Sequence, residues 1–152
     1  RRHILEVLEH QKALADNQIY PFSVCYVDLD HFKRINDEYG HDMGDRVLRQ
    51  FAEHTLDNLR EGDYLARLGG EEFILVLPQS DLAGAELVAE RLRESWAARS
   101  FEGRRGPPAE SLSAGVASYR GQETVDQLLG RADRALYRAK TGGRNRVCRE
   151  DQ

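Results

Sequence analysis

Four carboxylates stand where side chains from separate parts of the chain could act together. Asp28 and Asp30 end one apolar run, and Glu71 and Glu72 follow a pair of glycines. A few carboxylate oxygens, completed by water and phosphate oxygens, form the ligand set that Mg²⁺ prefers. Each acid taken alone is ordinarily a solvated turn residue. Their joint position at the ends of strand-like runs favours a magnesium site.

The second pair of acids is expected at the tip of a β-hairpin. Two strand-like runs, residues 64–68 and 73–77, flank Gly69-Gly70. Glycine takes the positive φ of a tight hairpin turn at no steric cost, so the pair marks the turn. Neighbouring glutamates repel one another there, and a bound metal ion or metal–polyphosphate would remove that cost.

Three polar residues shortly after the first acid pair could read a guanine base. Asp45 offers two acceptor oxygens for the guanine N1–H and exocyclic amine, and Asn36 offers both a donor and an acceptor. His41 lies between them. Taken singly, Asn36 and Asp45 are also typical cap or turn residues, and His41 is a typical surface histidine. His31 is expected to contribute through its backbone.

Basic residues on two segments could bind phosphate groups. Lys33 follows the first acid pair, and Lys140 and Arg144 lie near the end of the last predicted helix. The alternative for Lys140 and Arg144 is that they complement the negative end of the helix dipole.

The spacing of apolar residues and the turn signals predict ten elements around these residues. The predicted helices cover residues 3–15, 31–39, 44–59, 81–96 and 124–141, with Ser80 as the cap of the fourth and Thr124 with Gln127 as a capping box in the fifth. The predicted strands cover residues 22–29, 64–68, 73–77, 111–119 and 146–149, and a polar loop is expected at 99–109.

This order predicts a single α+β domain over residues 1–152. A strand–helix–strand crossover that embraces a hairpin is typical of a ferredoxin-like or palm-like core, an α/β sandwich. We expect a central, antiparallel-containing sheet of about five strands flanked by helices. The run at 22–29 is apolar throughout, which predicts a central strand buried on both faces. Gly115 inside a strand indicates the close approach of another backbone.

Composition and charge limit the partners and the cellular compartment expected for this chain. The 152 residues are 40% hydrophobic and carry a net charge of −4, so general electrostatics favour neither nucleic-acid binding nor direct membrane contact. Cys25 and Cys148 lie far apart without metal-site spacing, which predicts a free, buried Cys25 and a cytoplasmic setting. The abrupt start at Arg1-Arg2 suggests a fragment of a longer protein whose N-terminal sensor or membrane region precedes it.

Three ordered motifs resemble the GGDEF family of bacterial diguanylate cyclases. They are DLDHFKRINDEYGHDMGD at residues 28–45, RLGGEEF at 67–73, and ADRALYRAKTGGRN at 132–145. The resemblance runs from about residue 20 to the end of the chain. Glu71 stands where the namesake motif has Asp, and active members of the family accept both acids. The family's DxLTGLxNR stretch before the first helix is absent, except for its last Arg.

The resemblance implies a nucleotidyl-cyclase fold and a second-messenger function: two GTP molecules condense to cyclic di-GMP with release of two pyrophosphates. Each domain would hold one GTP, and a face-to-face homodimer would catalyse the reaction. Two Mg²⁺ ions per active site are implied, with Mn²⁺ as a possible substitute.

The resemblance implies a role for each residue that matches a functional position of the family. Asp28, the Leu29 carbonyl and Glu71 would bind metal, and Glu72 would lie beside the metals and phosphates. Asp28, Glu71 and Glu72 form the implied catalytic set, although the identity of the general base stays open. For the base, the resemblance implies that Asn36 and Asp45 contact guanine, with His41 close by. For the phosphates, it implies contacts from the backbone of His31, Phe32 and Lys33 and from the side chains of Lys140 and Arg144. Gly69 and Gly70 would leave room for the nucleotide beside the backbone.

A further match concerns inhibition by the product. Arg60 and Asp63 form the RxxD pattern of the family's inhibitory site, and Arg91 is a candidate second arginine from a neighbouring domain. A guanidinium can stack on guanine and pair with phosphate. The alternative is a capping turn between a helix and a strand.

Two other functions stay open on sequence alone. An inactive domain could bind GTP or cyclic di-GMP only as a sensor; the presence of Asp28, Glu71 and Glu72 argues against it. A cyclase for a different or mixed nucleotide is disfavoured by Asp45, because an acceptor-only carboxylate suits guanine's two donors and not the edge of adenine.

Overall fold

The computed structural model describes residues 2–99 and 110–150, and the predicted loop at 99–109 falls outside the described residues except for Arg99. The elements in chain order are α1 (Arg2–Asp16), β1 (Phe22–Leu29), α2 (Phe32–Tyr39), α3 (His41–Asn58), β2 (Tyr64–Gly69), β3 (Glu72–Pro78), α4 (Leu82–Ala98), β4 (Leu112–Ser118), α5 (Val125–Thr141) and β5 (Val147–Arg149). This order confirms the α+β prediction.

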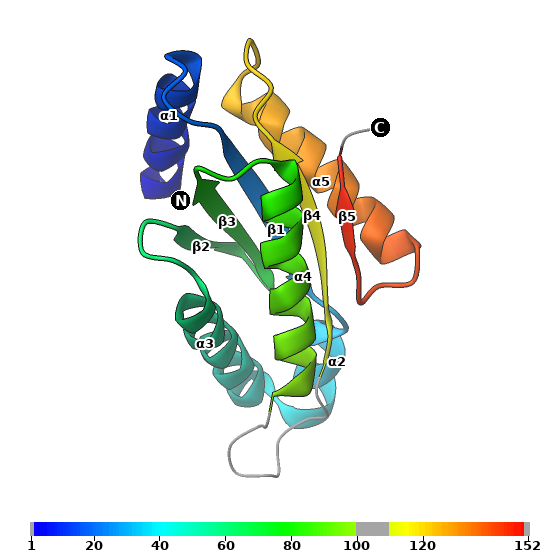
Figure 1. The fold of residues 1–152 in the computed structure, drawn as a ribbon. Coiled ribbons are helices and arrows are strands. Elements are labelled where there is room, and N and C mark those ends of the chain that lie inside the picture. The colour runs from blue at the N-terminus through cyan, green and yellow to red at the C-terminus, as the bar shows by residue number, and fades with distance from the viewer. Residues whose placement is uncertain (1, 100–109, 151–152) are drawn as a thin grey trace.

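The described strands form one mixed sheet in the order β2-β3-β1-β4-β5. β1 pairs antiparallel with both β3 and β4, β2 and β3 form the predicted hairpin, and β5 adds in parallel beside β4. The first four strands therefore have the ferredoxin-like order that the sequence predicted. β1 lies at the centre, and its carboxyl end lies beside the hairpin tip (Figure 1).

The sheet is buried on both faces because β1 alternates its apolar side chains between two cores. Cys25, Val27 and Leu29 belong to a cluster with α2, α3 and α4. Phe22 and Val24 belong to a second cluster with α1 and α5. Successive side chains of a strand point to opposite faces, so a continuous apolar run is what a strand between two helical layers requires. Figure 1 shows α4 crossing one face of this sheet.

Gly115 is where α5 comes closest to the sheet. A Cβ at this position would lie 2.2 Å from the Leu136 nitrogen and 2.4 Å from the Ala132 carbonyl oxygen, both in the backbone of α5. The predicted close approach is confirmed, and it places the end of α5 near the end of β1.

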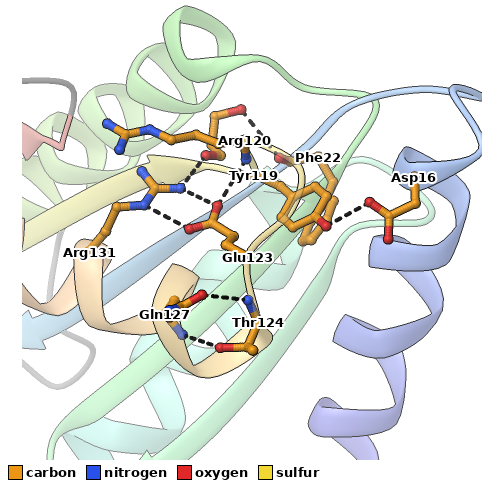
Figure 2. Close-up of polar contacts among 9 residues, drawn as sticks. Asp16, Phe22, Tyr119, Arg120, Glu123, Thr124, Gln127 and Arg131 are labelled. Atoms are coloured by element: carbon orange, nitrogen blue, oxygen red, sulfur yellow. Dashed lines mark hydrogen bonds and ion pairs between the residues drawn. The ribbon is translucent and has the colours of Figure 1, made fainter.

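The corner between β4 and α5 is fixed by a buried ion pair (Figure 2). Arg131 donates to both carboxylate oxygens of Glu123, at 3.1 and 2.6 Å, and to the Ser118 carbonyl at 2.7 Å. Burial alone would raise the pKa of Glu123, but the hydrogen bonds and charges of Arg131 and Arg120 together outweigh burial and lower that pKa below its usual value. Beside this corner, the Tyr119 hydroxyl donates to Asp16 at 2.6 Å and ties α1 to the sheet.

Some local predictions were wrong. α3 begins at His41 and not at Gly44. The cap of α4 is Asp81, whose carboxylate accepts from the Gly84 N–H at 2.8 Å, whereas Ser80 is buried beneath the helix start. The capping box of Thr124 and Gln127 is confirmed.

Candidate functional site

The predicted acids meet where β1 ends beside the hairpin tip. Asp28 is paired with Glu72 of β3 on one side and Ser113 of β4 on the other. One residue later, the Leu29 N–H donates to the Glu71 carbonyl at 3.3 Å. The sheet order brings together residues more than 40 positions apart, because β3 and not β2 is the neighbour of β1.

The hairpin tip depends on its glycines and on an arginine that sequence reasoning left without a role. Gly70 has φ +54, a conformation that costs glycine little. The strand register shifts between Arg67 and Gly69, which marks a bulge beside the turn. The Arg67 Nε donates to the Gly70 carbonyl at 2.8 Å and holds the turn from the β2 side. The sequence feature that could have indicated this contact is an arginine two residues before the glycine pair.

Asp28 forms an ion pair with Lys140, which reaches back from the end of α5. The Lys140 Nζ lies 2.7 Å from the Asp28 Oδ2, and the Asp28 side chain is only 5% exposed. Burial raises the pKa of Asp28 to about 6; Lys140 opposes that shift, and the charges of Glu71 and Glu72 add to it. Burial alone would lower the pKa of Lys140, but the hydrogen bond and charge of Asp28, together with the charges of Glu72 and Glu71, raise it above its usual value.

The ligand chemistry at this edge fits a divalent cation that arrives with phosphate. Asp28 and Glu71 offer carboxylates and Leu29 offers a carbonyl, all hard oxygen donors. A positive charge already sits against Asp28 in the form of Lys140. Over residues 2–99 and 110–150, no group of three or more His, Cys, Asp or Glu could hold a metal by itself. Mg²⁺ usually completes such a partial protein ligand set with water or phosphate oxygens.

Asp30 does not join the acids that face the hairpin. Its two carboxylate oxygens accept from the Ser111 hydroxyl at 2.6 Å, the Ser113 hydroxyl at 2.7 Å and the Asn145 N–H at 3.0 Å. The expectation that Asp30 belongs to the magnesium site is therefore wrong. These three hydrogen bonds instead connect the start of β4 and the segment after α5 to the end of β1.

A cavity of about 430 Å³ unites the predicted base-reading residues with the hairpin. It is lined by Phe32, Lys33, Asn36, His41, Asp45, Leu48, Arg67, Gly70 and Glu71. Helices α2 and α3 thus place the polar side chains of their facing surfaces over the turn that carries Glu71. Phe32 and Leu48 provide its apolar lining, and the other side chains bring convergent polar groups into the same space, as in many small-molecule sites.

Gly44 lets the two helices of this cavity approach. A Cβ at Gly44 would lie 1.9 Å from the Asn36 Oδ1 and 3.1 Å from the Phe32 ring. From the sequence, Gly44 was expected only to begin a helix. The structure shows that its missing side chain leaves the space that the Asn36 amide occupies.

The other predicted contacts lie around the same edge. His31 precedes α2 with φ 59, so Phe32 and Lys33 form the first turn of that helix. Gly69 ends β2 beside the turn. Arg144 is exposed in the segment between α5 and β5, with φ 62.

The Arg60–Asp63 pair lies at the other end of β2. The Arg60 side chain bonds Asp63 at 3.2 Å and also donates to the Pro78 carbonyl at 2.7 Å. The Arg60 side chain is 57% exposed, whereas that of Asp63 is 2% exposed. A shallow cavity of about 350 Å³ includes Arg60 and Gly84 and Val88 of α4. Arg91 is exposed on α4 but does not line this cavity.

No helix of the described residues is long and apolar enough to cross a membrane.

Comparisons with known proteins agree with this geometry. The family model described as "Diguanylate cyclase, GGDEF domain" matches residues 1–146. The diguanylate cyclase DgcP of Pseudomonas aeruginosa is 40% identical over 147 residues, which is 97% of this chain and 22% of that protein. The chain spans roughly a fifth to a third of the length of the curated relatives that it matches first.

Two solved structures are similar over the whole chain. The active GGEEF domain of a diguanylate cyclase from Vibrio cholerae has a TM-score of 0.93 and 36% identity, covering 100% of this chain and 97% of that one. The GGDEF domain of DgcB from Caulobacter crescentus, solved in complex with c-di-GMP, has a TM-score of 0.93 and 31% identity, covering 100% and 91%. The family match, the shared fold and the GGEEF turn beside Asp28 together show that this chain belongs to the diguanylate cyclase family as a GGDEF domain.

Proposed function

We propose that this domain condenses two GTP molecules into cyclic di-GMP and two pyrophosphates. The observation that carries the proposal is the shared cavity, in which Asn36 and Asp45 line the same space as Glu71. The pair proposed to read the base therefore lies close to the acid proposed to bind metal. Relatives named diguanylate cyclases, and a neighbour solved with c-di-GMP, support the same assignment.

The base end of the cavity selects guanine in this proposal. The Asp45 carboxylate accepts from the N1–H and the exocyclic amine, and Asn36 completes the edge through its amide. His41 lines the same wall. Adenine presents a different donor pattern, so the carboxylate discriminates against it.

The phosphate end lies between the first turn of α2, the hairpin turn and two basic residues, Lys140 in the last turn of α5 and Arg144 after that helix. The N–H groups at a helix start favour anions, and Lys33 lines the cavity there. Lys140, now paired with Asp28, has a phosphate as an alternative partner, and Arg144 lies four residues further along. Gly69 and Gly70 leave room for phosphate beside the backbone.

The chemical step forms a bond between a 3′-oxygen and an α-phosphorus and breaks the bond from that phosphorus to pyrophosphate. Mg²⁺, or Mn²⁺ in its place, held by Asp28, the Leu29 carbonyl and Glu71, would lower the pKa of the hydroxyl and offset the phosphate charge. The chain's own residues contribute position and fixed charge. Glu72 is exposed at the start of β3, beside these groups.

Two copies of the domain are needed in this proposal. One cavity contains one Asn36–Asp45 pair and so accommodates one guanine, whereas the product contains two. The attacking hydroxyl therefore comes from a GTP held by a second copy, facing the first as a homodimer. Binding of cyclic di-GMP at Arg60 and Asp63, with Arg91 of a neighbouring domain, is the proposed route of product inhibition.

The decisive experiment is to incubate the domain with GTP and Mg²⁺ at high protein concentration and to measure cyclic di-GMP by mass spectrometry. Glu71→Gln is expected to bring turnover to background while GTP still binds through Asn36 and Asp45. Glu53→Gln, which changes an exposed acid of α3, should leave turnover unchanged. A wild-type domain that binds GTP but forms no product, even when fused as a dimer, would favour a sensor function.

A further inference from the structure

Asp30 is the centre of a buried network that the proposed reaction does not use. Its side chain is 2% exposed and accepts three hydrogen bonds, from Ser111, Ser113 and the Asn145 backbone. Its own N–H donates to the Ser111 carbonyl at 2.9 Å. The network joins three segments that are far apart in sequence: the end of β1, the start of β4 and the turn after α5.

The turn after α5 carries Arg144 and has an unusual backbone. Gly143, Arg144 and Asn145 have φ values of 124, 62 and 49. Two consecutive non-glycine residues with positive φ are uncommon and persist only where the surroundings hold them. The Arg144 N–H donates to the Ala139 carbonyl at 2.9 Å on the helix side. The bond from the Asn145 N–H to Asp30 anchors the other side.

A second anchor comes from α4. Arg93 donates from Nη1 to the Asn145 Oδ1 at 2.9 Å. The guanidinium is itself held by Glu90, which accepts from Nε at 3.1 Å and from Nη2 at 2.5 Å. Arg93 is therefore oriented before it meets Asn145, so less side-chain entropy is lost in the contact. Asn145 is therefore held at two points: its backbone N–H donates to Asp30, directly after β1, and its side chain accepts from Arg93 of α4.

We propose that Asp30 and Arg93 are positioning residues that fix the turn after α5, so that Arg144 is held ready for the triphosphate of the nucleotide. The inference rests on the proposed function, because Arg144 is a phosphate contact only if the cavity binds GTP. It adds that recognition of phosphate is coupled to α4, the helix that also carries Arg91. It also explains why a carboxylate stands two residues from Asp28 without facing the hairpin.

The test compares binding of two ligands that cannot react. 3′-Deoxy-GTP lacks the attacking hydroxyl, and 3′-deoxyguanosine lacks the phosphates as well. In titration calorimetry with Mg²⁺, Arg93→Met and Asp30→Ala are each expected to weaken 3′-deoxy-GTP binding about tenfold, as for one lost charge-assisted hydrogen bond. Binding of 3′-deoxyguanosine should stay unchanged, because Asn36 and Asp45 are untouched.

Matched variants separate positioning from general damage. Glu86→Gln breaks another link of α4, its 3.2 Å ion pair with Arg149 of β5, and should leave both affinities unchanged. Asp30→Asn should restore most of the triphosphate affinity, because its amide oxygen can accept from Asn145 while its NH₂ donates to a serine hydroxyl. If Asp30→Ala does not fold, Arg93→Met carries the comparison.

A double-variant cycle completes the test. If Arg93 acts through Arg144, then Arg93→Met combined with Arg144→Met should lose no more affinity for 3′-deoxy-GTP than Arg144→Met alone. Fully additive losses, or an equal loss for 3′-deoxyguanosine, would overturn the inference. A wild-type domain that binds neither ligand would contradict the proposed function and, with it, this inference.

Discussion

Asp28 and Asp30 show how far two identical side chains can diverge within three residues. Both are buried, at 3% and 2% exposure. Asp28 is held by a single ammonium group, which a cation with its phosphates could replace. Asp30 is held by two hydroxyls and a backbone N–H, all of them fixed parts of the fold. The difference comes from the hydroxyls of Ser111 and Ser113, which both donate to Asp30, although Ser113 is the strand partner of Asp28.

Gly44 provides a prediction at the scale of one missing side chain. Gly44→Ala would place a Cβ 1.9 Å from the Asn36 Oδ1, so the amide must leave its position. We expect the KM for GTP to rise about tenfold, as for the loss of one or two hydrogen bonds. Steady-state kinetics on Gly44→Ala would measure this rise.

Gly130→Ala is the control, because a Cβ there meets only the flexible end of Arg134, at 3.7 Å. Its KM should equal that of the wild type. An unchanged KM in Gly44→Ala would show that the Asn36 position is unimportant for binding GTP.

Arg60 provides a second prediction at this scale. Arg60→Ala is expected to abolish inhibition by cyclic di-GMP while sparing the initial rate, because the residue lies at the far end of β2 from the hairpin turn. The lost bonds to the Pro78 carbonyl and to Ser80 should lower the free energy of unfolding by about 1–2 kcal/mol. Progress curves with and without added cyclic di-GMP give the answer.

Arg134→Ala, which removes an exposed arginine of α5, serves as the control for charge. If cyclic di-GMP inhibits Arg60→Ala and the wild type equally, the Arg60–Asp63 pair is a structural capping turn and does not bind the product.

The elements position the site through a few close contacts. α5 can lie against β4 only because Gly115 has no side chain, and this contact brings Lys140 to Asp28. α2 and α3 both line the cavity beside the hairpin turn, and α3 begins at His41, directly after Gly40. A start at Gly44, as the sequence predicted, would have left His41 and Asp42 outside the helix.

Gly115→Ala tests the close contact of α5. Its Cβ would lie within 2.4 Å of two backbone atoms of α5, and backbone cannot yield as a flexible side chain can. We expect the free energy of unfolding to fall by at least about 3 kcal/mol, at the upper end of overpacking costs. Urea unfolding followed by circular dichroism would measure it.

The comparison variant is again Gly130→Ala, in the middle of α5. A helix gains about 1 kcal/mol when an interior glycine becomes alanine, so this variant should be more stable than the wild type. Similar stabilities for the two variants would mean that α5 can move away from β4 at little cost.

On the scale of the whole molecule, two regions lie at opposite ends of β2. The cavity lined by Asn36, Asp45 and Glu71 lies at the hairpin end, and the Arg60–Asp63 pair lies at the other end. β2 has six residues, so at ~3.3 Å per residue the two regions lie about 20 Å apart along the strand. Product bound at Arg60, as proposed, would thus be separate from substrate, which is the geometry that feedback inhibition requires.

Assembly gives the last prediction. If each domain holds one GTP, activity depends on the encounter of two domains. The specific activity of the isolated domain should therefore rise with its concentration and level off when most of it is dimeric. Initial rates over a hundredfold range of concentration, at saturating GTP and Mg²⁺, would show this. A constant specific activity over that range would contradict catalysis by a transient homodimer.

Much of this protein was determined by its sequence alone. The continuous apolar run of β1, the glycine turn and the capping box of α5 each have a local cause, and each was predicted with the correct type of element. Short-range conformational preference and apolar periodicity are enough for these three features, because neighbours along the chain set them. The grouping of Asn36, Asp45 and Glu71 was instead implied by two motifs, at residues 28–45 and 67–73, that resemble a known family.

Only the tertiary structure decided what depends on distant neighbours. The separate uses of Asp28 and Asp30 are set by Lys140 and by serines more than 80 residues away. The space for Asn36 is set by Gly44 on the next helix. Capping by Asp81 in place of Ser80 follows from the burial of Ser80 beside Arg60. A carboxylate or a serine has the same local preferences in each setting; the partners that the sheet order brings to it determine its role.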